Sequence, residues 1–183
     1  LFACKESNVA VYPAIGANSN SVAEYVICSA MLLLRRAFQK NIEMISGVWP
    51  RQESSGLEVR GKTIGLIGYG EIAQRTNVIA KSLGMKVVAF DPYINASSDL
   101  WRDTEKLSLD KLLRVSDVIS LHIPLNKETN NLLDEKKLSL VKPSAVLINS
   151  ARGGILDENA LAKALRENRI RGAALDVFSE EPL

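Results

Sequence analysis

Residues 62–73, with the sequence Lys-Thr-Ile-Gly-Leu-Ile-Gly-Tyr-Gly-Glu-Ile-Ala, decide the fold of this chain. A mostly apolar run over 62–67 ends at Gly68, and the residues that follow, 72–83, repeat apolar side chains at helical spacing. Short apolar runs bounded by glycine are typical of buried strands. The stretch therefore predicts a strand, a glycine turn and a helix in immediate succession.

The turn has the Gly-x-Gly-x-x-Ala pattern of a dinucleotide-binding unit. In such a unit the first glycine permits a tight turn, and the second lets backbone N–H groups approach a pyrophosphate. The third small residue lets the helix pack on the strand, and the helix N-terminus favours the anion. The residues expected to bind the cofactor here are Gly68, Gly70, Glu71 and Ile72. We expect Glu71 to contribute its N–H, with its side chain turned to solvent.

Asp91 is the expected acidic partner of this turn. It ends the apolar run 86–90, about 20 residues after the glycine turn, which is the spacing of a carboxylate that binds a ribose 2′-OH. Residues 92–95 carry no cation that could receive a 2′-phosphate. The sequence therefore predicts NAD as the cofactor rather than NADP.

Strand-like and helix-like segments alternate through the rest of the chain. The expected strands are 62–67, 86–90, 118–121, 145–148 and 173–177, and the expected helices are 72–83, 109–115, 134–140 and 157–168. Ser108 and Asp157 are expected helix caps. The strands lack alternation of polar and apolar residues, as expected when helices cover both faces of a sheet. The predicted fold class is α/β, with a doubly wound parallel sheet of the Rossmann type.

The first 60 residues are organised differently. We expect a loop over 14–20, then one long helix from Ser21, its N-cap, to Gly47, and a polar linker over 49–61. The apolar coverage of this helix is wide enough to pack on a second domain or another subunit, which suggests a homodimer through the helix that starts at Ser21. The predicted division is 1–20 (hinge), 21–60 (helix and linker) and 61–183 (nucleotide-binding domain).

Composition excludes several classes of function. The 183 residues carry a net charge of +2, with no basic patch for nucleic acid or an anionic membrane. The longest apolar stretch, 26–34, is too short to span a membrane. A single histidine, His122, excludes a metal site with two or three histidines. Cys4 and Cys28 lack a C-x-x-C spacing, so we expect buried thiols in a reducing, cytoplasmic location.

Five stretches give the chain a resemblance to the D-isomer-specific 2-hydroxyacid dehydrogenase family, which includes phosphoglycerate dehydrogenase. They are Gly68–Gly70, Phe90–Tyr93, His122–Leu125 with Thr129, Ile148–Gly154, and Ala174–Phe178 with Glu181-Pro182. The resemblance covers nearly the whole chain. It implies an NAD-dependent oxidoreductase in which the nucleotide-binding domain is inserted into a substrate domain. Residues 1–20 would then be the tail of the substrate domain, and the chain would stop before the catalytic histidine and be inactive alone.

Arg152 follows the expected strand 145–148, at the carboxyl edge where open α/β sheets bind ligands. Its guanidinium can hold a carboxylate with two hydrogen bonds and stabilise charge on a ketone oxygen. The resemblance implies that Arg152 binds and activates a small 2-hydroxy or 2-keto acid, possible examples being phosphoglycerate, lactate and glyoxylate. The alternative is a surface arginine in a glycine-rich turn, with no role in function.

The resemblance also assigns roles to other residues. Glu181 would pair with the catalytic histidine and raise its pKa, although a glutamate there could simply be solvated. Asn18 would touch substrate from the hinge. The residues implied to line the cofactor are His122, Ile123, Pro124, Thr129, Ser150, Arg152 and Asp176, and His122 is expected to do so rather than act as the general acid. Thr76 and Asn77 replace the apolar residues of many relatives, which bears on local packing.

Two alternatives from other classes stay open. One is an NAD-sensing interaction module, similar to corepressors that share this fold and use NAD to control dimerisation. The other is a methyltransferase with a similar glycine turn, which Arg152-Gly153-Gly154 and Glu181 disfavour.

Overall fold

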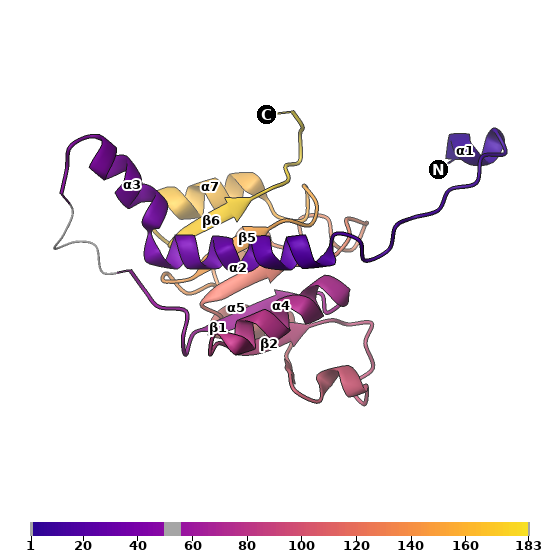
Figure 1. The fold of residues 1–183 in the computed structure, drawn as a ribbon, viewed down its shortest axis with the longest axis horizontal. Helices are drawn as coiled ribbons and strands as arrows, with labels where there is room; N and C mark the ends of the chain where they lie inside the picture. The colour runs from indigo at the N-terminus through magenta and orange to yellow at the C-terminus, as the bar shows by residue number, and fades with distance from the viewer. Residues whose placement is uncertain (1, 50–55, 183) are drawn as a thin grey trace.

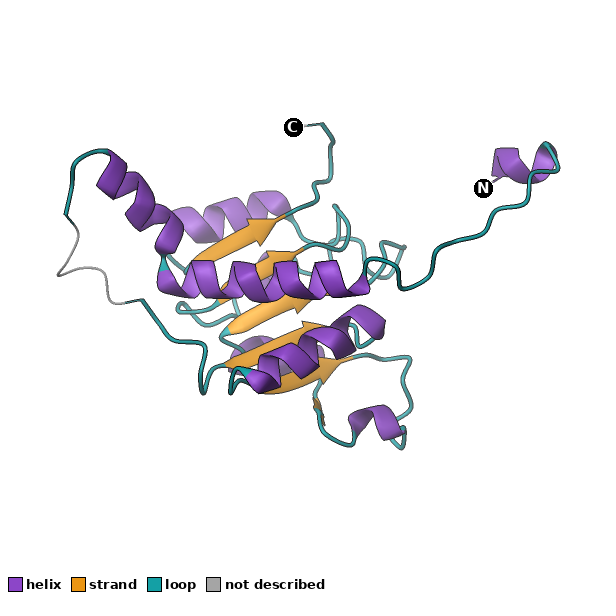
Figure 2. Cartoon of the chain, in the orientation of Figure 1, coloured by secondary structure: helices purple, strands orange, loops and turns teal. Residues whose placement is uncertain are grey.

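A six-stranded parallel sheet forms the centre of the molecule (Figures 1 and 2). The structure is a computed structural model that describes residues 2–49 and 56–182. The strand order is β3-β2-β1-β4-β5-β6. The strands are β1 (Thr63–Ile67), β2 (Lys86–Phe90), β3 (Glu105–Lys106), β4 (Val118–Leu121), β5 (Val146–Asn149) and β6 (Gly172–Leu175). The order reverses between β1 and β4, so a ligand crevice is expected at the carboxyl ends of those strands. The predicted fold class is confirmed.

Helices cover both faces of the sheet, as the uniformly apolar strands predicted. The helices are α1 (Phe2–Glu6), α2 (Ser19–Arg35), α3 (Ala37–Ile45), α4 (Glu71–Ser82), α5 (Leu109–Val115), α6 (Glu135–Leu138) and α7 (Glu158–Arg166), with a short 3₁₀ turn, η1 (Asp99–Trp101). One core cluster packs α2 and α4 on the sheet, and a second packs α5, α6 and α7 on it. β1, β4 and β5 are almost entirely buried between these layers.

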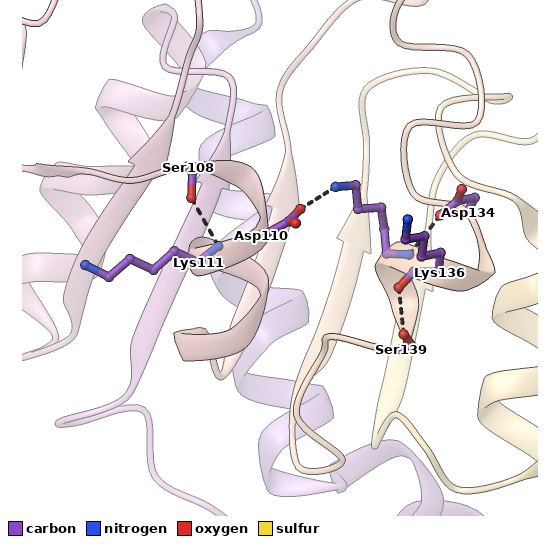
Figure 3. A network of polar contacts seen from close by, with 7 residues as sticks. Ser108, Asp110, Lys111, Asp134, Lys136 and Ser139 are labelled. Atoms are coloured by element: carbon purple, nitrogen blue, oxygen red, sulfur yellow. Dashed lines mark hydrogen bonds and ion pairs between the residues drawn. The ribbon is translucent and has the colours of Figure 1, made fainter.

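Side-chain caps fix where three of these helices begin. Ser108, Asp134 and Asp157 accept hydrogen bonds from backbone N–H groups in the first turns of α5, α6 and α7. Ser108 and Asp157 therefore act as the caps that the sequence predicted. Figure 3 shows the first two caps and the ion pair between Asp110 and Lys137, which joins α5 to α6.

The long helix predicted from Ser21 to Gly47 is wrong in two respects. It begins earlier, at Ser19, with Asn18 in the N-cap position. It is also broken at Arg36, which has φ 55° and ψ 29° in the left-handed region and separates α2 from α3. A single left-handed residue leaves apolar spacing intact on either side, so periodicity could not reveal it.

Three smaller features also differ from the sequence predictions. α1 and the short edge strand β3 were not anticipated. Cys28 is exposed on α2 and Cys4 is partly exposed, so neither is the buried thiol expected.

The predicted linker lies partly outside the described residues, because 50–55 are not described. Within the ranges that are described, no helix is both long enough and apolar enough to cross a membrane.

Candidate cofactor-binding site

The two glycines of the turn after β1 have different structural roles. Gly68 has φ +89°, and a Cβ there would lie 2.5 Å from the carbonyl oxygen of His122, so only glycine fits. Gly70 has φ −75°, and a Cβ there would have no atom within 4 Å. Gly68 thus makes the turn possible, whereas Gly70 leaves open space in front of the backbone.

That open space lies at the N-terminus of α4. Gly70 is the N-cap of this helix and offers no side-chain cap, so the first N–H groups of α4 have no side-chain acceptor among the residues that the structure describes. The Glu71 carboxylate forms an ion pair with Arg75 at 2.9 Å, and Arg75 donates to Asn20 Oδ1 at 2.7 Å. Glu71 is exposed and directed along the helix, as predicted, which leaves its N–H available to an anion.

Asp91 lies beside this turn, at the end of β2. Its Oδ2 accepts the Tyr69 N–H at 2.9 Å and its Oδ1 accepts the Tyr93 N–H at 2.9 Å. Each carboxylate oxygen can accept a further hydrogen bond. Asp91 therefore holds the glycine turn against the end of β2 and still faces the neighbouring cavity.

Two adjoining cavities follow the carboxyl edge of the sheet. The first, of about 360 Å³, is lined by Gly68, Gly70, Phe90, Asp91, Pro92, Tyr93, His122, Ile123, Pro124, Asn126, Glu128, Thr129 and Leu132. The second, of about 290 Å³, is lined by Asn18, Val22, Ile72, Leu121, His122, Ile123, Pro124, Ser150, Ala151 and Arg152. They share His122, Ile123 and Pro124, so together they form one extended cleft across β1 and β4. Most of the residues predicted for the cofactor and substrate come together here.

His122 lies where the two cavities meet. Burial lowers the pKa of its imidazole to about 4, which leaves the ring neutral near pH 7. Its Nε2 is buried without a hydrogen-bond partner in the described part of the chain. A neutral ring is a poor general acid, and the role of His122 in lining a cofactor stays a prediction.

The cleft has the features that a dinucleotide requires. Buried polar atoms without a partner are rare in proteins and call for an explanation. Besides His122 Nε2, the buried Ser150 Oγ has no partner among the described residues, and both residues line the second cavity. With the open space at Gly70 and the bare N-terminus of α4, these atoms give a ligand polar contacts along the cleft. The residues present therefore fit an extended, anionic cofactor.

The turn that carries Arg152 is held by Asn149, a role that was not predicted. Asn149 is 2% exposed at the end of β5, where its Oδ1 accepts the Ala151 N–H at 3.1 Å and its Nδ2 donates to the Arg152 carbonyl at 2.9 Å. The Arg152 side chain is exposed at the second cavity and donates to the Ala151 carbonyl. Asn149 thus fixes the backbone while the guanidinium stays accessible.

Three predicted residues have other surroundings. The Thr129 hydroxyl lines the first cavity but donates to the Pro124 carbonyl at 2.7 Å, so it also holds its own loop. Asp176 is exposed after β6, and Glu181 accepts the Phe178 N–H at 2.9 Å. Neither Asp176 nor Glu181 lines the two cavities within the described ranges.

A buried polar network beneath the turn was also not predicted. Asn77 Nδ2 donates to the Tyr69 hydroxyl at 2.8 Å and to Thr104 Oγ1 at 3.1 Å, and the Tyr69 and Thr104 hydroxyls are 2.7 Å apart. The Tyr69 ring stacks on Trp101 with centroids 5.1 Å apart. The signal in the sequence was the polar Asn77, at a position where the resemblance implies an apolar residue. The network ties the glycine turn to the segment before β3.

The parallel sheet, the glycine turn and the cleft define a dinucleotide-binding domain of the Rossmann type. A family model described as "D-isomer specific 2-hydroxyacid dehydrogenase, NAD binding domain" matches residues 27–183. The chain belongs to this family, which confirms the family and the NAD-binding class predicted from the sequence.

Similar proteins agree with this assignment. An (S)-sulfolactate dehydrogenase of Chromohalobacter salexigens is 47% identical over 182 residues, covering 99% of this chain and 59% of that protein. A D-3-phosphoglycerate dehydrogenase of Haemophilus influenzae is 42% identical over 182 residues, covering 100% of this chain and 44% of that protein. A D-lactate dehydrogenase from Lactobacillus jensenii, solved with NAD⁺, has a TM-score of 0.87 at 32% identity, covering 97% of this chain and 54% of that one. The chain spans about half the length of these relatives.

Proposed function

We propose that this chain is the NAD(H)-binding part of an enzyme that transfers a hydride between NAD(H) and a small 2-hydroxy or 2-keto acid of the D-isomer type. The observation that carries the proposal is the open space at Gly70, at the uncapped N-terminus of α4 and beside Asp91. A pyrophosphate needs such N–H donors. In this fold an acidic residue about 20 residues after the glycine turn binds the adenosine ribose, and Asp91 has that place.

The cleft divides between the two ends of the cofactor. Gly68, Gly70, Glu71 and Ile72 would hold the pyrophosphate through the backbone, and Asp91 would accept a ribose hydroxyl. Pro124 and Thr129 line the cavity on the adenosine side, where Asp91 lies. His122, Ile123 and Ser150 would contact the central and nicotinamide parts. Asp176 would lie near the nicotinamide end, as the family resemblance implies.

The chemistry of the chain's own residues follows from the needs of a ketone reduction. NADH, when bound, supplies the hydride. Arg152, at the end of the cleft opposite Asp91, would bind the substrate carboxylate and stabilise the charge that develops on the ketone oxygen. Asn18 lines the same cavity and would contact the substrate from the hinge. Glu181 would raise the pKa of a histidine outside this chain, which would act as the proton donor.

The proposed substrates include phosphoglycerate, and the similar proteins carry the names of several acids of this class. Turnover of a panel of 2-keto acids by the longest polypeptide that contains residues 1–183 tests the proposal. Arg152→Ala should remove most of that turnover while the NADH dissociation constant stays within about twofold. Tight NADH binding with no turnover of any acid would instead support the NAD-sensing module.

We also propose a homodimer through α2 and α3 and a cytoplasmic location. α3 and the residues after it expose Phe38, Ile42, Ile45 and Trp49, with Phe38 71% and Ile45 80% exposed. Apolar side chains gathered on one surface mark an interaction site. Phe38→Asp should shift the molecular mass measured by light scattering from dimer to monomer, and an unchanged mass would contradict this interface.

A further inference from the structure

The segment that carries Glu181 is held by the start of α7. Ser179 makes two hydrogen bonds to one side chain: its N–H donates to Glu158 Oε1 at 2.6 Å, and its hydroxyl donates to Glu158 Oε2 at 2.9 Å. Both carboxylate oxygens are therefore engaged by a single residue 21 positions further along the chain. This pair closes the C-terminal segment onto the body of the domain.

Glu158 is well fixed for this task. It is the first residue of α7 and is partly buried, and the N-cap before it, Asp157, accepts the Ala160 N–H at 2.9 Å. The positive end of the helix dipole favours a carboxylate at this position. Glu158 is thus a hydrogen-bond acceptor whose place is set by the helix rather than by the segment that it holds.

The same segment also touches the turn of Arg152. A Cβ on Gly153 would lie 1.8 Å from the Phe178 carbonyl oxygen, so the two backbones are in direct contact. The Phe178 N–H donates to Glu181 Oε1 at 2.9 Å, which folds the Glu181 carboxylate back over its own turn. Residues 178–181 are therefore fixed at two places, against Gly153 and against Glu158.

We infer that Glu158 is a positioning residue for the reaction, holding the turn of residues 178–181 against the turn of Arg152. It thereby sets where the Glu181 carboxylate lies relative to the Arg152 guanidinium. The inference rests on the proposed function, in which Arg152 binds the substrate and Glu181 acts on the histidine that protonates it. Because a misplacement of about 1 Å can reduce the rate on the order of 100-fold, loosening this contact should slow turnover without touching the cofactor.

Glu158→Ala, Glu158→Gln and a control, Glu135→Ala, test the inference in the longest polypeptide that contains this chain. Glu158→Ala removes both acceptors. Glu158→Gln keeps a carbonyl oxygen for the Ser179 N–H, and its amide can donate to the Ser179 hydroxyl. Glu135 forms an exposed ion pair with Lys163 of α7 at 2.8 Å and does not contact residues 178–181 in the described structure.

We expect kcat of Glu158→Ala to fall roughly 10- to 100-fold, with the NADH dissociation constant unchanged. Its pH profile should shift in the same direction as that of Glu181→Gln. Glu158→Gln should recover most of kcat, Glu135→Ala should behave as the wild type, and the Ser179 amide should exchange faster only in Glu158→Ala. Unchanged kcat, a parallel loss of NADH affinity, failure of the glutamine variant to recover, or an unmoved pH profile would each overturn the inference. Absence of turnover in the wild type would contradict the proposed function instead, and an unchanged Ser179 exchange rate would then still contradict the contact itself.

Discussion

Asp91 combines a structural role with the proposed binding role. Its two oxygens hold the N–H groups of Tyr69 and Tyr93, so the carboxylate is already oriented before a ligand arrives. Asp91→Asn removes the charge that would repel a 2′-phosphate, and it weakens a hydrogen bond of the charged type, worth roughly 1.5–3 kcal/mol. We expect NADH affinity to fall about tenfold or more and the preference for NADH over NADPH to shrink, both measured by titration.

Asp99→Asn is the matched control, because the Asp99 side chain is 92% exposed on η1, in the segment between β2 and β3, and pairs only with Arg102 in the described structure. It should leave both dissociation constants unchanged. Unaltered cofactor preference in Asp91→Asn would count against the assignment of its carboxylate to the ribose.

His122 should make stability depend on pH. Its pKa of about 4 in the folded protein lies below the ordinary value of 6.5, so both states are neutral above pH 6.5. Between pH 6.5 and about 4 the unfolded chain binds a proton that the folded chain does not. The folded state therefore loses about 1.4 kcal/mol per pH unit in this window.

His122→Gln removes this titration. The unfolding free energies of the wild type and the variant are measured by urea denaturation at pH 7.5 and at pH 5. Between these two values the wild type should lose roughly 2 kcal/mol more unfolding free energy than the variant. An equal difference at both values would mean that the ring is protonated in the folded state near pH 5.

At the scale of the element, the two glycines of the turn after β1 should affect different properties: Gly68 the stability of the fold, and Gly70 the binding of the cofactor. Gly68→Ala puts a side chain at φ +89° and within 2.5 Å of the His122 carbonyl oxygen, so it should destabilise the domain by about 1–3 kcal/mol or more. Gly70→Ala meets nothing within 4 Å and should leave unfolding within about 0.5 kcal/mol of the wild type. NADH titration of the Gly70 variant should nevertheless show at least tenfold weaker binding, because the methyl group enters the space proposed for the phosphates. Wild-type affinity in that variant would place the phosphates elsewhere.

The break between α2 and α3 gives a second prediction at this scale. The left-handed conformation of Arg36 costs an L-residue roughly 1–2 kcal/mol, which glycine avoids. Arg36→Gly should therefore raise the unfolding free energy by about 0.5–1 kcal/mol. Glu24→Gly, at an exposed position within α2, should lower it by about 1 kcal/mol. Destabilisation by both glycines would show that Arg36 is helical in solution.

The sequence predicted the elements of the sheet better than it predicted the N-terminal helices. The strands are short, apolar and closely bounded by turn residues. Ser108 and Asp157 are typical N-cap residues and mark where the next helices begin. The start of α2 and the break at Arg36 depend on backbone angles that hydrophobic spacing does not encode. The short strand β3, Glu105–Lys106, forms through pairing with β2 rather than through its own residues.

The residues of the site that belong to a sequence motif could be predicted. The side chains that hold those residues in place could not. The glycine turn, Asp91 and Arg152 lie at the expected edge of the sheet. Asn149 and Glu158 were not predicted, because their partners are backbone groups and a serine that only the folded chain brings near.

At the scale of the whole molecule, the cleft depends on segments that are distant in the sequence. The start of α2 supplies Asn18 and Val22, the glycine turn supplies Gly70, and the ends of β4 and β5 lead to His122 and Ser150. α2 packs on the same face as α4, so the cleft is bounded by the helix that leads from the N-terminal segment into the sheet (Figure 1). A ligand bound there should stabilise the domain, because it would bind only the folded chain, in which residues as distant as Asn18 and Arg152 line one cleft.

NADH titration of the 183-residue chain, followed by calorimetry, tests the central claim most directly. The account predicts saturable binding of one NADH per chain, weakened at least tenfold by Gly70→Ala and left within about twofold by Arg152→Ala. No saturable binding by the folded wild-type chain, or equal binding by the wild type and Gly70→Ala, would contradict it.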